Sequence, residues 1–91
     1  MAIEWADSAD RHGIAREDAV HAILKRVYYV AGFDQSRTGG TAPDLFIGYS
    51  RDGQQLIEVM IQPVPPRDGI VFHVMPARQK IIDIAKRKAK P

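Results

Sequence analysis

The spacing of apolar residues changes twice along the chain. Between residues 15 and 27 they recur every three or four positions, which is the spacing of one helical face. The members of this stripe are Ala19, Val20, Ile23, Leu24 and Val27. Acidic Glu17 and Asp18 lie at its start and basic Lys25 and Arg26 near its end, as the helix dipole favours. The pattern predicts a helix that begins at residue 15 and ends near Tyr28.

Apolar runs of strand length follow this helix. Residues 27–33 are rich in β-branched and aromatic side chains, which favour a first strand. Residues 45–49 and 56–61 are two further runs, and the Asp52-Gly53 pair lies between them. Because glycine accepts the positive φ of a tight turn, Asp-Gly between two apolar runs predicts a β-hairpin. Residues 70–75 predict one more strand.

Glycine and proline suggest where the remaining elements end. Residues 3–12 predict a short helix or an extended lead-in that ends at Gly13, and residues 34–43 predict a loop. Prolines cannot donate to a strand ladder, so the strand that begins at residue 56 is predicted to end within residues 62–68. Pro76 is predicted to begin a final helix, which would bury Ile81, Ile82 and Ala85 and fray over residues 86–91.

Together these elements predict one α+β domain over residues 1–91. It would have two N-terminal helices, a small antiparallel sheet of three to four strands and one C-terminal helix, with the helices on one side of the sheet. A chain of 91 residues has room for one modest core and no separate cofactor domain. It has no cysteine, which excludes disulfides and thiolate zinc sites. Neither a signal peptide nor a membrane span is evident, so a cytoplasmic location is expected.

Charge is unevenly distributed although the net charge is only +2. Residues 1–20 hold five acidic residues against two arginines, a net charge of −3. Residues 67–91 hold seven basic residues against two aspartates, a net charge of +5. The C-terminal quarter is therefore a candidate surface for a polyanion such as RNA.

Several short motifs follow one another along the chain: Ile3-Glu4-Trp5, His12-Gly13-Ile14 followed by Glu17-Asp18-Ala19, Ile47-Gly48 followed by Asp52-Gly53 and Leu56, and residues 71–78 ending in Ala77-Arg78. Their order resembles that of the BrnT family of type II toxins, which are related to the RelE-type ribonucleases. The chain resembles a divergent member of that family. The resemblance implies a RelE/BrnT-like fold, an endoribonuclease that inhibits translation without a metal or cofactor, and a cognate antitoxin of the ribbon-helix-helix type. DNA would be bound only through the antitoxin.

The chemistry of RNA cleavage selects candidate catalytic residues. A base must deprotonate the 2′-hydroxyl, an acid must protonate the leaving 5′-oxygen, and a cation must neutralise the phosphorane. Strand alternation predicts Ile70, Phe72 and Val74 on the core face, with His73 on the open face. We therefore predict that His73, Arg78 and Arg51 form the catalytic cluster.

Candidate RNA-binding residues surround this cluster in the sequence. They are Lys80, Lys86, Arg87 and Tyr49, the last as a stacking surface for a base. Each candidate also has a structural interpretation. His73 can bond a neighbouring strand, Arg78 can pair with Asp44 or Glu58, and the basic tail can simply be solvated. The three histidines match no metal-ligand spacing, and the position of His12 before Gly13 is explained by helix termination.

Some departures from the family pattern keep a second function open. The family often has an arginine where this chain has His73, and its tail helix contains a glutamate and a tyrosine that residues 81–90 lack. The alternative to a toxin is therefore a catalytically inactive RNA- or protein-binding module of the same fold.

Overall fold

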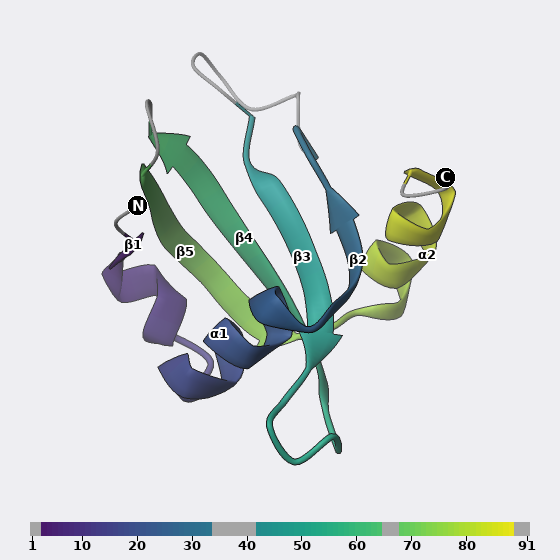
Figure 1. The fold of residues 1–91 in the computed structure, drawn as a ribbon, viewed down its shortest axis with the longest axis horizontal. Coiled ribbons are helices and arrows are strands. Elements are labelled where there is room, and N and C mark those ends of the chain that lie inside the picture. Colours follow the sequence, from purple (N-terminus) through teal and green to yellow (C-terminus); the bar gives the residue numbers. More distant parts are fainter. Residues whose placement is uncertain (1–2, 34–41, 65–67, 89–91) are drawn as a thin grey trace.

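The computed structural model describes residues 3–33, 42–64 and 68–88 as one five-stranded sheet with two α-helices (Figure 1). In chain order the elements are β1 (Ile3–Trp5), the short 3-10 helix η1 (Asp7–Asp10), α1 (Arg16–Leu24), β2 (Arg26–Val30), β3 (Asp44–Tyr49), β4 (Leu56–Val64), β5 (Asp68–Pro76) and α2 (Gln79–Lys88). The strand order is β1-β5-β4-β3-β2. Strand β1 is parallel to β5, and the other neighbours are antiparallel. None of the described helices is long and apolar enough to cross a membrane.

The predicted arrangement of elements is wrong, although the protein is an α+β domain. The sheet is mixed and five-stranded, where an antiparallel sheet of three to four strands was expected. The first expected helix is instead β1 followed by η1. Three residues are too few to show a strand period, and β1 forms because it pairs with residues 69–71 of β5. Two contacts then hold η1 along the same strand: Ala6 N donates to Val71 O (2.9 Å) and Ser8 Oγ donates to Phe72 O (2.6 Å).

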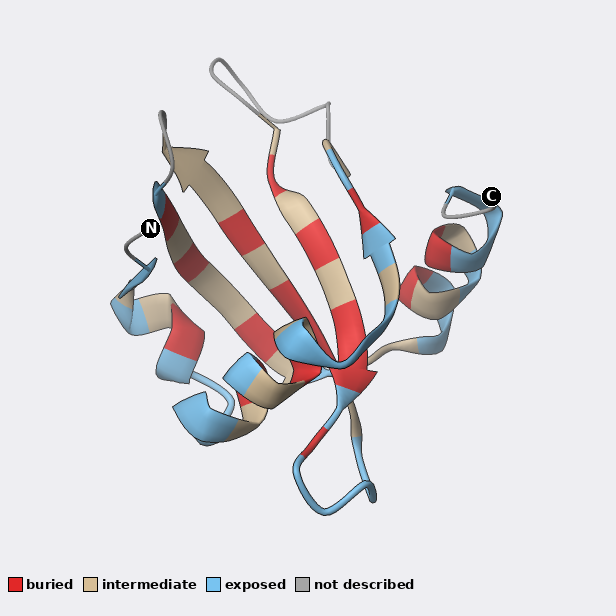
Figure 2. Cartoon of the chain, viewed as in Figure 1, coloured by how far each residue is buried: buried red, intermediate tan, exposed pale blue. Residues whose placement is uncertain are grey.

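The two α-helices cover opposite faces of the sheet, so the prediction that the helices share one side is also wrong. Alternate residues of β4 belong to different cores, and buried and half-buried residues occur along the length of β3, β4 and β5 (Figure 2). Ile57, Val59 and Ile61 pack with α1, whereas Leu56 and Met60 pack with α2. We call these the α1 face and the α2 face.

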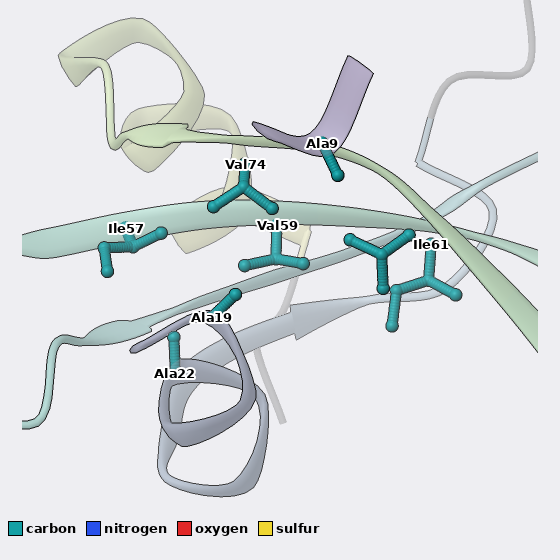
Figure 3. Packing of buried hydrophobic residues seen from close by; sticks show 8 residues of the cluster. Ala9, Ala19, Ala22, Ile57, Val59, Ile61 and Val74 are labelled. Atoms are coloured by element: carbon teal, nitrogen blue, oxygen red, sulfur yellow. The ribbon is translucent and has the colours of Figure 1, made fainter. Parts of the chain in front are cut away.

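Small residues set the packing on the α1 face. Ala19 and Ala22 of α1 are fully buried against Ile57 and Val59 (Figure 3). A Cβ atom on Gly48 of β3 would fall on the Ala22 carbonyl, so only glycine lets α1 lie this close to the sheet.

Because of this close packing, α1 buries a different face from the one that the sequence predicted. The helix ends at Leu24 rather than near Tyr28, and three of the five residues expected inside lie exposed. Those exposed residues are Val20, Leu24 and Val27, which are 41%, 70% and 50% accessible. Alanines therefore supply the buried surface that the larger residues were expected to supply.

The α2 face has a separate core, in which Ile81 and Ala85 of the predicted C-terminal stripe are buried and Ile82 is partly buried. Ile81 and Ala85 pack against Val30, Leu45 and Ile47. The helix begins at Gln79, however, because Pro76 is the last residue of β5 and not the first of the helix. Residues 86–88, which were expected to fray, form the last turn of α2, and the rest of that predicted tail lies outside the described residues.

The predicted hairpin of residues 45–61 is confirmed, but two details of β4 and β5 were not expected. Strand β4 ends at Val64, within the predicted range of residues 62–68, but it includes Pro63, which pairs with Gly69. Strand β3 pairs with β4 only as far as Ile61, so Pro63 has one strand neighbour and its missing N–H is tolerated. In β5 the register shifts by one residue at Phe72. The loop predicted over residues 34–43 lies almost entirely outside the described residues.

Candidate functional site

A buried carboxylate in the middle of the sheet organises the candidate site. Glu58 of β4 has a side-chain exposure of 0% and lies on the α2 face. Oε1 accepts hydrogen bonds from His73 Nε2 (2.8 Å) and from Arg78 Nη2 (2.7 Å). Oε2 accepts from the backbone N of Arg78 (3.0 Å) and, at 3.4 Å, from its Nε. We call Glu58, His73 and Arg78 the Glu58 cluster.

A bulge in β5 places His73 on this face. Strict alternation would put residues 71 and 74 on opposite faces, yet Val71 and Val74 are both buried in the core on the α1 face. The extra residue at Phe72 resets the alternation, so that His73 pairs with Met60 and faces the same side as Glu58. The prediction that His73 lies opposite Val74 is right. The prediction that residues 70, 72 and 74 form the core face is wrong, because the bulge makes Val71 a core residue.

The position of Arg78 is fixed by the connection between β5 and α2. Ala77 N donates to Leu56 O (2.8 Å), which extends the ladder one residue beyond β5. The next backbone N–H, that of Arg78, then points at Glu58. Main chain and guanidinium of one residue therefore hold the same carboxylate, and 38% of the Arg78 side chain stays accessible to solvent.

The electrostatics of the cluster favour an ionised Glu58. Burial raises the pKa of its carboxyl, but the hydrogen bonds from His73 and Arg78 outweigh burial and lower the pKa from 4.5 to about 2. The same pairing raises the pKa of Arg78. An ionised carboxylate only accepts hydrogen bonds, so Nε2 of His73 must carry a proton. His73 can then gain or release a proton only at Nδ1.

A second histidine lies beside the cluster. The ring of His12, in the connection between η1 and α1, meets the ring of His73 edge to face with centroids 6.3 Å apart. His12 is exposed, and no described hydrogen bond occupies its ring nitrogens. The sequence interpretation assigned His12 only to helix termination. Its structural alternatives, in which His73 bonds a neighbouring strand and Arg78 pairs with Glu58, are what the contacts show. One signal for Glu58 was available, since it is the only charged residue in the apolar run of residues 56–61.

Arg51 lies apart from the other two predicted catalytic residues. Its Nε donates to Asp18 Oδ1 of α1 (2.8 Å), and its backbone N donates to the same oxygen (3.0 Å). This exposed pair fastens the β3–β4 turn to α1 and raises the pKa of Arg51. Among the described contacts none joins Arg51 to His73 or Arg78, so the expected three-residue cluster is not assembled.

The predicted RNA-binding residues lie on and near α2. Lys80, Lys86 and Arg87 are exposed on this helix, which begins directly after Arg78. Tyr49 is 46% accessible and pairs with Leu56 at the end of β3, and its carbonyl accepts a hydrogen bond from His21 Nδ1 (2.8 Å). The basic helix therefore starts beside the Glu58 cluster.

Within residues 3–33, 42–64 and 68–88, no three histidine, aspartate or glutamate side chains are grouped as metal ligands. Comparisons with known proteins give no matching family model, no similar curated protein and no similar solved structure.

Proposed function

We propose that this protein is an RNA-cleaving toxin of a type II toxin–antitoxin pair that acts through His73 and Arg78. The observation that supports the proposal is the buried, ionised Glu58, which orients an imidazole and a guanidinium toward one partly exposed site. A charged residue is buried this completely only where it is paired, and such perturbed groups are concentrated at functional sites.

Each group has a role in cleavage that its chemistry supports. Nδ1 of His73 exchanges a proton with a reacting oxygen while Glu58 keeps the ring in one orientation. The exposed part of Arg78 stabilises the negative charge that develops on the phosphorane. These side chains supply proton transfer and charge stabilisation without a metal, as the resemblance to the BrnT family also implies.

The surroundings of the site suit RNA as the substrate. Lys80 and Arg87 are seven residues apart and share one face of α2, with Lys86 beside them. Cations in this position attract the phosphate backbone without regard to sequence, and the attraction weakens as salt rises. Tyr49 offers a ring to an unstacked base at the end of β3.

The proposal includes an antitoxin that keeps the toxin inactive. Val20 and Leu24 of α1 and Val27 of β2 are exposed apolar side chains that a protein partner could cover. If the product of a neighbouring gene is the antitoxin, its coexpression will restore growth. DNA binding would belong to that partner.

The test is tightly induced expression in a bacterial host, followed by growth and total RNA integrity. We expect arrest and RNA loss with the wild-type chain, and relief with His73→Ala or Arg78→Ala. The matched controls are His21→Ala and Arg51→Ala, which remove the same residue types outside the Glu58 cluster and should stay toxic. Soluble, folded wild-type protein that leaves growth and RNA intact contradicts the proposal. The inactive binding module would then be favoured, and RNA retention without cleavage would identify it.

A further inference from the structure

We propose that His12 is the second catalytic histidine of this site and that His12 and His73 act as an acid–base pair on one phosphodiester. This inference rests on the proposed ribonuclease function and adds a residue, a division of roles and a product. The product would be an RNA fragment ending in a 2′,3′-cyclic phosphate together with a fragment beginning with a 5′-hydroxyl.

The distance between the rings suits a shared phosphate. Their centroids lie 6.3 Å apart, at an interplanar angle of 69°. Proton transfer requires a heavy-atom distance of about 2.6–3.2 Å from each nitrogen to its reacting oxygen. The attacking and leaving oxygens lie on opposite sides of the same phosphorus, so one nitrogen from each of two neighbouring rings can reach them. A single imidazole would have to serve both oxygens in turn.

His12 is held in place although it lies outside regular structure. The preceding η1 is tied to β5 by the hydrogen bonds of Ala6 and Ser8. After it, Arg16 binds Asp10 through Nη2 (2.8 Å) and Nε (3.2 Å), which closes the connection over residues 10–16. The backbone N of Gly13 also donates to Asp10 O (3.1 Å). The His12 ring is therefore carried on a braced turn, while its nitrogens stay open to a ligand.

The different surroundings of the two rings assign their roles. The Glu58 carboxylate offsets a positive charge on His73, and Arg78 adjoins that same carboxylate. We therefore assign His73, whose Nε2 is held by this carboxylate, as the acid of the pair. The exposed His12 ring lies beside the His73 ring, and we assign it as the base of the pair.

Protons and bonds balance in one displacement. His12 removes the proton of the 2′-hydroxyl, and the 2′-oxygen forms a bond to phosphorus. The bond from phosphorus to the 5′-oxygen breaks, and that oxygen receives the proton that His73 held at Nδ1. The step leaves His12 protonated and His73 neutral, and proton exchange with water restores the starting state.

The test uses the purified full-length chain with a mixed-sequence single-stranded RNA, both alone and in a translating extract. Cleavage rates are compared for wild type, His12→Ala, His73→Ala and the control His21→Ala, and mass spectrometry identifies the new ends. We expect each of the first two substitutions to slow cleavage by about 10²–10⁴-fold, the usual contribution of a general acid or base. The control should change the rate by less than about twofold, since His21 lies outside the cluster.

A second substrate separates the two roles. When sulfur replaces the bridging 5′-oxygen, the leaving group no longer needs a proton. The modified RNA should therefore restore cleavage by His73→Ala and leave His12→Ala slow. Circular dichroism and the melting temperature check that both variants are folded. We expect His12→Ala in particular to fold normally, because His12 is exposed.

The outcomes distinguish this inference from the function on which it rests. If the wild-type protein leaves the RNA intact both alone and in the translating extract, the ribonuclease function and the acid–base pair are contradicted together. If the wild-type protein cleaves RNA and His12→Ala cleaves it at the same rate, the acid–base pair is wrong and the ribonuclease function stands. A cleavage product without a cyclic phosphate leads to the same conclusion. Rescue of His12→Ala by the sulfur substrate reverses the assigned roles and contradicts the proposal as stated.

Discussion

Replacing Glu58 by glutamine should cost this protein much of its stability at neutral pH. Glutamine keeps the shape of the side chain but resembles the protonated acid, so the variant loses the charged form that His73 and Arg78 hold. One unit of pKa corresponds to about 1.4 kcal/mol, so lowering the pKa from 4.5 to about 2 represents roughly 3 kcal/mol in favour of the ionised side chain. The total free energy of unfolding of a domain of this size is only about 5–15 kcal/mol, so the loss is large enough to measure.

The loss should disappear in acid. The folded-state pKa of Glu58 lies below its ordinary value, so the ionised carboxylate stabilises the fold above pH 4.5, and this contribution is lost as the pH falls toward about 2. The glutamine variant has no such group. The difference in unfolding free energy between the two proteins should therefore be greatest above pH 5 and shrink steadily between pH 4.5 and 2.

The measurement is urea unfolding at pH 7, 5 and 3, followed by the fluorescence of Trp5, the single tryptophan, which packs against the core on the α1 face. Glu4→Gln is the matched control, because Glu4 is exposed on β1 and its replacement should change stability by no more than about 0.5 kcal/mol. Equal urea midpoints for Glu58→Gln and wild type at pH 7 would refute the reasoning. So would a difference that stays constant down to pH 3.

Three further substitutions test the packing and the limits of the site. Gly48→Ala should destabilise the protein by about 1–3 kcal/mol or more, because the new Cβ falls on the Ala22 carbonyl; thermal unfolding measures this. Ile81→Ala should cost about 2–5 kcal/mol through the cavity left under α2, and a loss below that range in urea unfolding would show that α2 is loosely docked. Arg51→Ala breaks only an exposed pair with Asp18 and should leave both the melting temperature and any RNA cleavage unchanged.

Local signals in the sequence predicted the central hairpin and the C-terminal helix but not the sheet as a whole, and the errors arose where tertiary contacts decide. The hairpin over residues 45–61 was predictable because Asp52-Gly53 specifies its own turn. Strand β1 was not, since three residues become a strand only through pairing with a segment more than sixty positions away. The buried face of α1 was misjudged for a similar reason. The close approach of Ala22 to Gly48 outweighs the burial that Val20 and Leu24 would have gained.

The residues of the candidate site could likewise be predicted only in part from the sequence. His73 and Arg78 were suggested by residue type and position near the last strand, and they do share a partner. The bulge at Phe72 has no sequence signature, yet it decides which neighbours of His73 belong to the core. Arg51 was assigned to the cluster because a hairpin turn can reach an open sheet face. The structure instead ties that turn to α1 through Asp18.

Stability alone is a weak explanation for Glu58. A buried ion pair must first offset the cost of removing both charges from water, and an apolar residue in the same place is often as stable or more so. The neighbours of Glu58 on the same face of β4 are Leu56 and Met60, which pack against the apolar core there, so this face accepts apolar residues on both sides of Glu58. What an apolar residue cannot do is fix the tautomer of His73 and hold Arg78 at the same point. The position thus makes sense as a device that orients two partly exposed side chains, and this is why we expect Glu58→Gln to impair RNA cleavage more than an apolar core substitution of equal cost to stability.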